Sequence, residues 1–367
     1  MSLTTQKSFS KEEQKVLDSI KLNRIILPVI IGLGVVVYLI WKQWDPEVVG
    51  QIDWSSATAF WLIMSALLYV IRHLFYAWRL RVLSDKVFSW WKSIELVFIW
   101  EFSSAVSPTS IGGAGVALFF LAQEELSAAK TVAIVVYTMI IDTLYFLITL
   151  PLLYFVVGPI VLRPNAQTFA DLEGYGIGFW SIIIFMTIYG SIFFYGVFVK
   201  PIWLSNVLKW LSNRKVLGRF KESLQETASD VIVSSGELKS KPNSYHIQVF
   251  VSSTGACITR FLAINCIIIA LIKGVPLDFW NQFTLFGRGQ AMHSLVQFSP
   301  TPGGAGITEY LFEGFFSDYI PAGLAIIVAL IWRLITYYPY LIAGAIIIPN
   351  WLRKIVNKRR NNTLKEN

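Results

Sequence analysis

"SPTPGGAGITE", residues 299–309, interrupts a stretch of sequence that is otherwise apolar. It places two prolines, three glycines and a glutamate where a hydrophobic helix would be expected to continue. "SPTSIGGAG", residues 107–115, repeats most of the pattern in the first half of the chain. Proline removes a backbone donor, and glycine permits tight turns and close backbone approach. The two stretches therefore predict two interrupted helices.

The composition indicates the class of protein that contains these breaks. Of 367 residues, 55% are hydrophobic and 15% are charged, with a mean hydropathy of +0.57. A soluble domain carries about 25% charged residues. The net charge of +8 is concentrated between apolar runs, which is typical of cytoplasmic membrane flanks and not of a nucleic-acid-binding protein. Two cysteines in one apolar run and three scattered histidines predict no disulfide framework, metal site or cofactor.

The apolar runs predict an all-α polytopic membrane protein. About 20 apolar residues cross a bilayer. Six runs are long enough, at 25–41, 58–77, 131–157, 177–199, 246–272 and 321–348. Two further segments, 94–122 and 280–317, each consist of two shorter apolar pieces joined at a Pro/Gly stretch. Such short pieces favour re-entrant hairpins over complete crossings.

Loop charge predicts the orientation. The Lys/Arg-rich flanks are 1–24 with five, 72–93 with five, 200–245 with eight and 351–367 with six. All of them face the cytoplasm if both hairpins return to the side that they entered from. The predicted parts are then a cytoplasmic or interfacial N-terminal helix (1–24), a first membrane repeat (25–157), an external loop (158–176), a second repeat (177–348) containing a cytoplasmic interfacial loop (200–245), and a basic cytoplasmic tail (349–367).

The two halves share the order span, span, broken hairpin, span, with opposite orientations. This order predicts an inverted-topology repeat, an architecture common among transporters. When Gly115 is aligned with Gly306, Asp142 falls on Arg333. We therefore expect Asp142 and Arg333 to approach one another between the halves, either as a static ion pair or as part of the mechanism.

The Pro/Gly stretches are the predicted binding site. Each precedes a half-helix whose first amides and positive dipole end could bind a phosphate or carboxylate. Packing of small residues between helices is the alternative role for these glycines. The candidate substrate-binding residues are Ser107, Thr109, Gly112, Gly113, Gly115, Ser299, Thr301, Gly303, Gly304, Gly306 and Glu309.

Intramembrane charges are costly and therefore mark functional candidates. The main ones are Glu101, Asp142, Arg260, Glu309 and Arg333. Glu309 is assigned to proton coupling or to binding a cationic headgroup. Weaker candidates are Arg288 and His293, while Arg72, Arg79 and Arg81 are predicted to contact anionic lipid at the cytoplasmic interface.

The sequence resembles the lysylphosphatidylglycerol synthase transmembrane-region family, also described as a flippase-like domain. The resemblance rests on both Pro/Gly stretches, on "YAWRLRVL" at 76–83 and on "WRLITYYPYLIAG" at 332–344, and it extends from about residue 25 to 350. One departure is Met139, where related chains often have Arg three residues before the aspartate of the third span.

The resemblance implies a bacterial inner-membrane protein that moves or binds a phosphorylated amphiphilic lipid. The alternatives are a membrane subunit or transferase acting on lipid-linked phosphate, and a coupled transporter of a small anion. No catalytic motif is found, and the soluble domain of the aminoacyl-lipid synthases is not expected here, so synthase activity is not implied. The predicted partners are membrane lipids, with a homo-oligomer or a lipid-modifying enzyme as further options.

Overall fold

The computed structural model describes Trp41, Gly50 and residues 52–107, 110–124, 126–214, 221–297, 299, 301, 304, 306–321 and 323–365. Within these residues the regular structure is entirely helical, as predicted. The predicted N-terminal helix (1–24) and, apart from Trp41, the first predicted span (25–41) lie outside the described residues.

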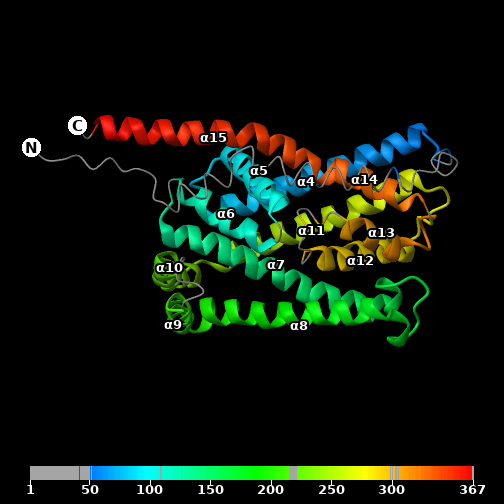
Figure 1. Ribbon diagram of the computed structural model, residues 1–367, viewed down its shortest axis with the longest axis horizontal. Coiled ribbons are helices and arrows are strands. Elements are labelled where there is room, and N and C mark those ends of the chain that lie inside the picture. The colour runs from blue at the N-terminus through cyan, green and yellow to red at the C-terminus, as the bar shows by residue number, and fades with distance from the viewer. Residues whose placement is uncertain are drawn as a thin grey trace, which may run out of the picture.

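Five long apolar helices form the body of the protein (Figure 1). They are α4 (Ser56–Leu83), α7 (Ala128–Val157), α8 (Gly174–Phe194) with the π-helical turn η3 (Tyr195–Val199), α11 (Asn243–Leu271), and α14 (Ala325–Thr336) continued by α15 (Tyr338–Lys365). Their lengths of 26 to 31 residues, with the last counted from Ala325 to Ile355, and their composition are sufficient to cross a membrane. They correspond to the last five of the six predicted spans.

The two Pro/Gly stretches do interrupt helices. Helix α5 (Trp90–Val106) ends just before the first stretch and α6 (Ser110–Ala122) begins within it; α12 (Phe279–Val296) ends before the second stretch and α13 (Ile307–Phe316) begins within it. These four helices have 17, 13, 18 and 10 residues. At 1.5 Å per residue, none of the four exceeds about 27 Å, whereas the hydrocarbon core is about 30 Å thick.

The last predicted span, 321–348, is divided between two helices. Helix α14 ends at Thr336 and α15 begins at Tyr338. Pro339 follows the junction directly and has no backbone donor, and its ring would clash with the carbonyl of Ile335 in a continuous helix. Beyond the apolar run, α15 continues as helix to Lys365, so the predicted basic tail extends the span's own helix.

Helices α4 and α11 pack together along most of their length and run in opposite directions. Ser65 donates a hydrogen bond of 3.0 Å to the carbonyl of Ala263, and Arg79 donates one of 2.9 Å to Ser253. Between these two contacts, Gly255 lies against the ring of Phe75 so closely that a Cβ would be 2.6 Å from it. This antiparallel pair forms the centre of the bundle.

Each broken segment has its own hydrophobic cluster. The first joins α5 and α6 to parts of α7 and α15, and the second joins α12 and α13 to α8, α11 and α14. The two arrangements are similar, since α5 packs on α15, where Gly344 contacts Phe102, and α12 packs on α7, where Tyr145 donates a hydrogen bond to Gln290.

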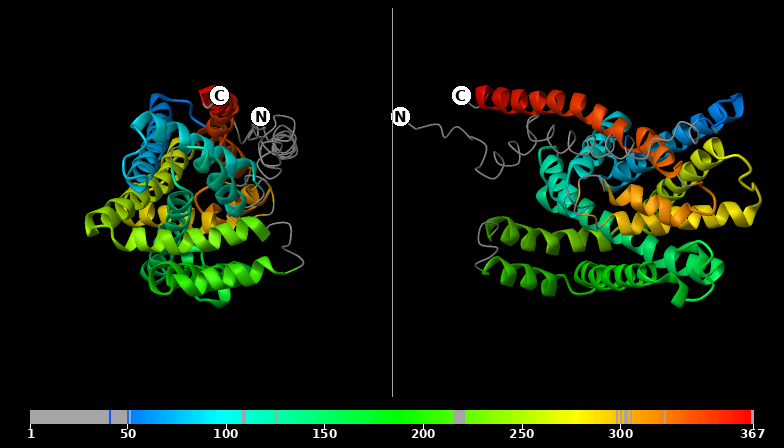
Figure 2. Two further views of the ribbon diagram at one scale, coloured as in Figure 1. Left: turned by 90° about the vertical axis from the view of Figure 1, so that its left-hand side faces the viewer. Right: turned by 45° about the vertical axis from the view of Figure 1, so that its right-hand side comes forward.

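Two helices lie across one end of the bundle. Helices α9 (Pro201–Ser212) and α10 (Lys221–Lys239) run roughly perpendicular to the long helices, at the end where α15 finishes (Figure 2). Trp203 and Trp210 of α9 are exposed among basic residues, which suits an interfacial helix. At the other end, the connection from α7 to α8 contains the short helices η1 (Pro159–Val161) and η2 (Ala170–Leu172).

Asp85 joins four elements at the end of the bundle that carries α9 and α10. It lies in the turn after α4, 2.5 Å from Lys130 of α7 and 2.7 Å from Lys241, which precedes α11. Lys130 also contacts Glu237 of α10 at 2.5 Å. Burial acts to raise the pKa of Asp85, but hydrogen bonds from the two ammonium groups outweigh it and hold that pKa below its ordinary value.

We expect Asp85→Asn to lower the melting temperature at neutral pH. The melting temperature of the variant should also fall less than that of the parent as the pH is lowered. A carboxyl with a lowered folded-state pKa stabilises the protein above its unfolded pKa of about 3.9, and this contribution is lost as pH falls through the folded value. Melting curves of detergent-solubilised protein from pH 7 to pH 3 should therefore converge for parent and variant at the acid end. Asp53→Asn, beside the exposed Lys273 at 3.6 Å, is the control. Parallel curves for parent and Asp85→Asn would contradict the assignment.

Candidate functional site

A cavity of about 180 Å³ lies between the two broken segments. Both Pro/Gly stretches contribute to its wall, together with helices from each half of the chain. Its lining residues are Tyr69 of α4; Glu101, Ser104 and Ala105 of α5; Ser107; Arg260 of α11; His293 and Val296 of α12; Gln297, which follows α12; Ser299, Thr301 and Gly304 of the second stretch; Trp332, Arg333 and Thr336 of α14; Tyr337; and Tyr340 of α15.

Many of the residues singled out in the sequence meet in this cavity, and others do not. The lining includes Ser107, Ser299, Thr301, Gly304, Glu101, Arg260 and Arg333. Three glycines of the first stretch (Gly112, Gly113 and Gly115) lie in α6, while Gly306, Glu309 and Asp142 are not lining residues. Thr109 and Gly303 lie outside the described residues.

The backbone of the second stretch requires glycine. Gly304 and Gly306 have φ values of +68° and +85°, in the left-handed region that glycine adopts without strain. A Cβ on Gly304 would also lie 2.6 Å from Val296 and 2.8 Å from Thr308. Substituting Gly304 would therefore disturb the fold, which supports a structural role for this glycine.

The first turn of α13 is capped by the protein itself. The amide of Gly306 donates a 2.7 Å hydrogen bond to Oε2 of Glu309, which is 8% exposed. The carboxylate also pairs with Arg333, whose Nε lies 2.6 Å from Oε1. This helix start was a predicted binding position for a substrate anion, but a protein carboxylate occupies it.

The predicted approach of Asp142 to Arg333 is wrong. Asp142 pairs with Arg79 of α4 at 2.6 Å, and Arg333 pairs with Glu309. Equivalent positions in an alignment of the halves indicate similar depth, but they do not determine which neighbouring helix supplies the opposite charge. Each charge is neutralised within its own half.

Two arginines predicted at the interface are buried instead. Arg72 is 0% exposed and donates to both oxygens of Glu101 at 2.9 and 2.8 Å, and to the hydroxyl of Tyr340 at 2.9 Å. Arg79 is 8% exposed. The signal was present in the sequence, because positions 72, 76 and 79 share one face of a helix and Tyr76 stacks on both guanidinium groups. Arg81 lies over the ring of Trp90 at the end of α4.

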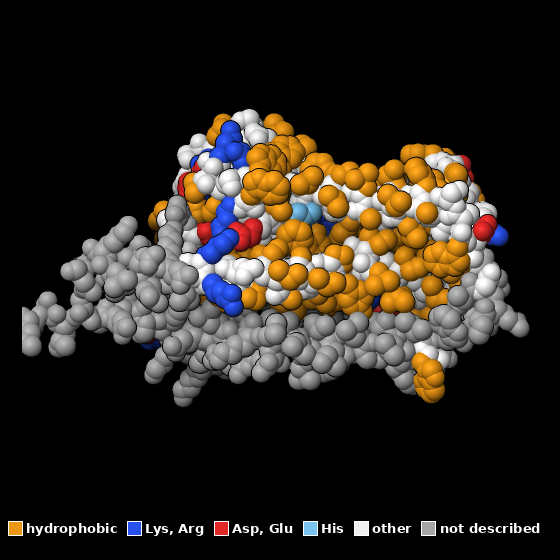
Figure 3. Space-filling view, turned by 90° about the horizontal axis from the view of Figure 1, so that it is seen from above, with side chains coloured by type: hydrophobic (Ala, Val, Ile, Leu, Met, Phe, Trp, Pro, Cys, Tyr) orange, Lys and Arg blue, Asp and Glu red, His pale blue; other side chains and the backbone are white. Residues whose placement is uncertain are grey.

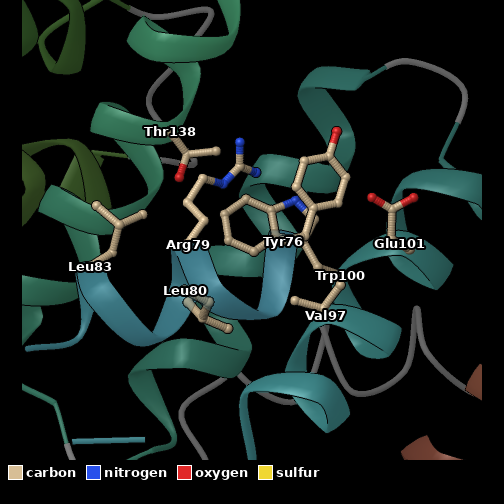
Figure 4. Close-up of a pocket in the computed structure, with 8 residues that line it drawn as sticks. All are labelled: Tyr76, Arg79, Leu80, Leu83, Val97, Trp100, Glu101 and Thr138. Carbon is tan, nitrogen blue, oxygen red and sulfur yellow. The ribbon is translucent and has the colours of Figure 1, made fainter. Parts of the chain in front are cut away.

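A smaller pocket of about 30 Å³ adjoins this polar face of α4, between α4, α5 and α7. Figure 4 shows the guanidinium of Arg79 pointing toward the rings of Tyr76 and Trp100, with Thr138 on one side and Glu101 on the other. The hydroxyl of Thr138 is buried without a hydrogen-bond partner in the described residues. The volume suits about one water molecule. Glu101 lines both this pocket and the larger cavity.

Arg260, which is partly buried, differs from the buried arginines Arg72, Arg79, Arg288 and Arg333. Its NH1 donates a 2.7 Å hydrogen bond to Nε2 of His293, while its Nε is buried without a partner. Within the described part of the chain, no carboxylate lies within 4.0 Å of it. By contrast, Arg288, the fully buried arginine of α12, pairs with Asp318 and donates to the carbonyl of Ile160. No group of three metal-ligating side chains occurs among the described residues.

Comparison with known proteins identifies the family. The profile of the lysylphosphatidylglycerol synthase transmembrane region matches residues 25–344, which include both Pro/Gly stretches and the cavity between them. The chain belongs to this family. It is therefore a membrane protein with several helices capable of spanning the bilayer.

A membrane protein of Archaeoglobus fulgidus, described as a UPF0104 membrane protein, is similar to this synthase-region family member. The two are 25% identical over 311 residues, which cover 81% of this chain and 89% of the archaeal one. No solved structure matches the chain. In this lysylphosphatidylglycerol synthase-region protein, position 139 is Met, and the guanidinium beside Asp142 comes from Arg79 of a different helix.

Proposed function

We propose that the protein translocates a phospholipid or another phosphorylated amphiphilic lipid, with the headgroup passing through the cavity between the two broken segments. The observation that carries the proposal is the cavity itself, which both Pro/Gly stretches line and which contains Arg260 without a carboxylate partner among the described residues. A guanidinium without a carboxylate partner in a low-dielectric site favours a phosphate or carboxylate ligand.

An inverted repeat with six spans and two re-entrant hairpins would place this cavity near the middle of the bilayer. Two features support that arrangement. The central helices α4 and α11 are antiparallel, and the packing of α5 on α15 corresponds to that of α12 on α7. The short helices α5, α6, α12 and α13 could each enter the membrane without crossing it. Transporters with such repeats bind substrate where the irregular backbone meets.

The charge distribution on the described surface supports an orientation with the C-terminal end in the cytoplasm of a plasma membrane, and the Lys/Arg-rich sequence 1–24 predicts the same side for the N-terminus. Apolar side chains cover most of the described surface in Figure 3, and most of its Lys and Arg side chains lie toward one end. In Figure 1, α9, α10 and the C-terminal end of α15 lie at this same end of the molecule. Positive flanks of membrane helices face the cytoplasm.

The dimensions suit a headgroup and not a complete lipid. Pockets that enclose a drug-sized ligand have volumes of about 300–1,000 Å³, larger than the 180 Å³ found here. The acyl chains would then remain in the bilayer beside the apolar outer faces of the helices. Only the polar headgroup would need the protein, because its desolvation in hydrocarbon opposes unassisted movement.

The test is lipid movement in vesicles that contain the purified protein. We expect acyl-labelled fluorescent phosphatidylglycerol in the inner leaflet to become accessible to dithionite at a rate above that of protein-free vesicles, without ATP. Arg260→Gln should remove this acceleration, whereas Arg163→Gln, in the loop from α7 to α8, should retain it. Size-exclusion profiles verify that each variant is folded. Equal rates with and without the parent protein would exclude translocation and favour a role as a subunit of a lipid-modifying enzyme or as a transporter of soluble anions.

A further inference from the structure

The charges around the cavity are almost all paired within the protein. Glu101 is held by Arg72 through one nitrogen that reaches both carboxylate oxygens, at 2.8 and 2.9 Å. Glu309 is held by Arg333 at 2.6 Å, and it also caps α13. Both carboxylates are therefore neutralised before any ligand arrives. Neither is available to bind an amine without losing its arginine.

Arg260 is the arginine, among the described residues that line the cavity, that has no carboxylate within 4.0 Å. Its hydrogen-bond partner is the Nε2 atom of His293, which accepts and therefore carries no proton in this arrangement. The imidazole ring is packed against Phe146 and Phe261, with ring centroids 6.2 and 5.6 Å away. This packing orients the imidazole and thereby positions the guanidinium. The charged lining residues are Glu101, Arg260 and Arg333, and Arg72 and Glu309 beside the cavity pair with Glu101 and Arg333, so these five charges sum to +1.

We infer that the cavity selects headgroups with a net negative charge and excludes cationic headgroups. This inference rests on the proposed function and adds the sign of the substrate to it. A phosphate would supply the anionic partner that Arg260 lacks among the described residues, and Ser104 and Ser107 line the same space. A cationic headgroup would meet Arg260 with no unpaired carboxylate among the described lining residues, and in a low-dielectric site the repulsion is poorly screened.

A cavity that selects anionic headgroups would not favour lysylphosphatidylglycerol, the lipid in the family's name. Lysylphosphatidylglycerol carries two amines and one phosphate, so its headgroup is cationic. A cavity for such a headgroup would need carboxylates free of arginine partners. Here Arg72 and Arg333 occupy the two carboxylates at and beside the cavity. Arg260 is thus a specificity-determining residue, and His293 is a positioning residue for it.

The experiment compares three acyl-labelled lipids in vesicles that contain the parent protein. We expect phosphatidylglycerol to move about tenfold or more faster than lysylphosphatidylglycerol, with zwitterionic phosphatidylcholine between them. Tenfold is the order expected from one charge-assisted hydrogen bond. If the parent moves lysylphosphatidylglycerol as fast as phosphatidylglycerol, the inference is wrong and translocation stands. If no labelled lipid moves, the proposed function itself fails.

Variants at two positions sharpen the result. Arg260→Lys should retain the preference for phosphatidylglycerol, and Arg260→Glu should reverse it. His293→Gln, which keeps an acceptor for Arg260, should retain most of the preference, and His293→Leu should reduce it. Expression and melting temperature equal to the parent's are required of each variant. An unchanged headgroup preference in folded Arg260→Glu would overturn the assignment.

A binding measurement separates a lipid phosphate from a free one. Dihexanoylphosphatidylglycerol and inorganic phosphate are added to the solubilised protein at equal concentration, and melting temperatures are compared. We expect the short-chain lipid to raise the melting temperature of the parent but not of Arg260→Gln, with little effect of phosphate alone. If inorganic phosphate raises the melting temperature as much as the short-chain lipid does, the conclusion that the bound anion is a lipid phosphate is wrong.

Discussion

Glu309→Ala is expected to destabilise the protein by about 3–5 kcal/mol, the cost typical of removing one partner of a buried ion pair. Arg333 is 2% exposed, and its guanidinium would be left without its carboxylate inside the bundle. The same substitution removes the 2.7 Å hydrogen bond that caps α13 at Gly306. The measurement is unfolding in detergent followed by tryptophan fluorescence, with yield of monodisperse protein as a second readout.

Two controls separate the charge from the cap. Glu309→Gln keeps an acceptor for the Gly306 amide but removes the charge, so it should recover only part of the loss. Glu173→Ala breaks the exposed pair with Arg163, whose atoms are 2.8 Å apart, and should change stability little. A Glu309→Ala protein as stable as Glu173→Ala would show that the buried pair is unimportant, and would restore the sequence-based view of Glu309 as a residue that acts on the substrate.

Glu101→Gln is expected to have an effect of similar size, again about 3–5 kcal/mol. Arg72 is 0% exposed, and its guanidinium is surrounded by the rings of Tyr69, Tyr76 and Tyr340 at 4.6 to 5.6 Å. Aromatic faces attract a cation but do not replace a carboxylate. The same unfolding assay in detergent measures the change.

Removing both charges distinguishes an ion-pair effect from a loss of packing. The double variant Arg72→Met with Glu101→Gln leaves no unpaired charge, and buried pairs replaced by neutral groups are often as stable as the parent. It should therefore be more stable than Glu101→Gln alone. If the double variant is the less stable of the two, the contribution of Arg72 lies in its packing and not in its charge.

The sequence predicted the helices because that information is local. Hydrophobic length indicated five spans now seen as helices, and Pro and Gly marked both interrupted segments. Pro339 was an equally local signal for the break between α14 and α15, since proline cannot continue the hydrogen-bond ladder. The apolar run around it was long enough to conceal that signal.

The sequence also identified most of the charged candidates, because charges within apolar runs are rare and costly. By itself it determined the membrane class, the family, the two breaks and the residues that needed explanation. Only the tertiary structure decided the pairs, with Asp142 joined to Arg79, Glu101 to Arg72 and Glu309 to Arg333. An ion pair depends on which helix faces are in contact and at what height along the bundle. Local sequence patterns do not indicate such contacts between side chains that are far apart in the chain. For the same reason, the unpaired state of Arg260 became visible only once every carboxylate near it had been assigned to another arginine.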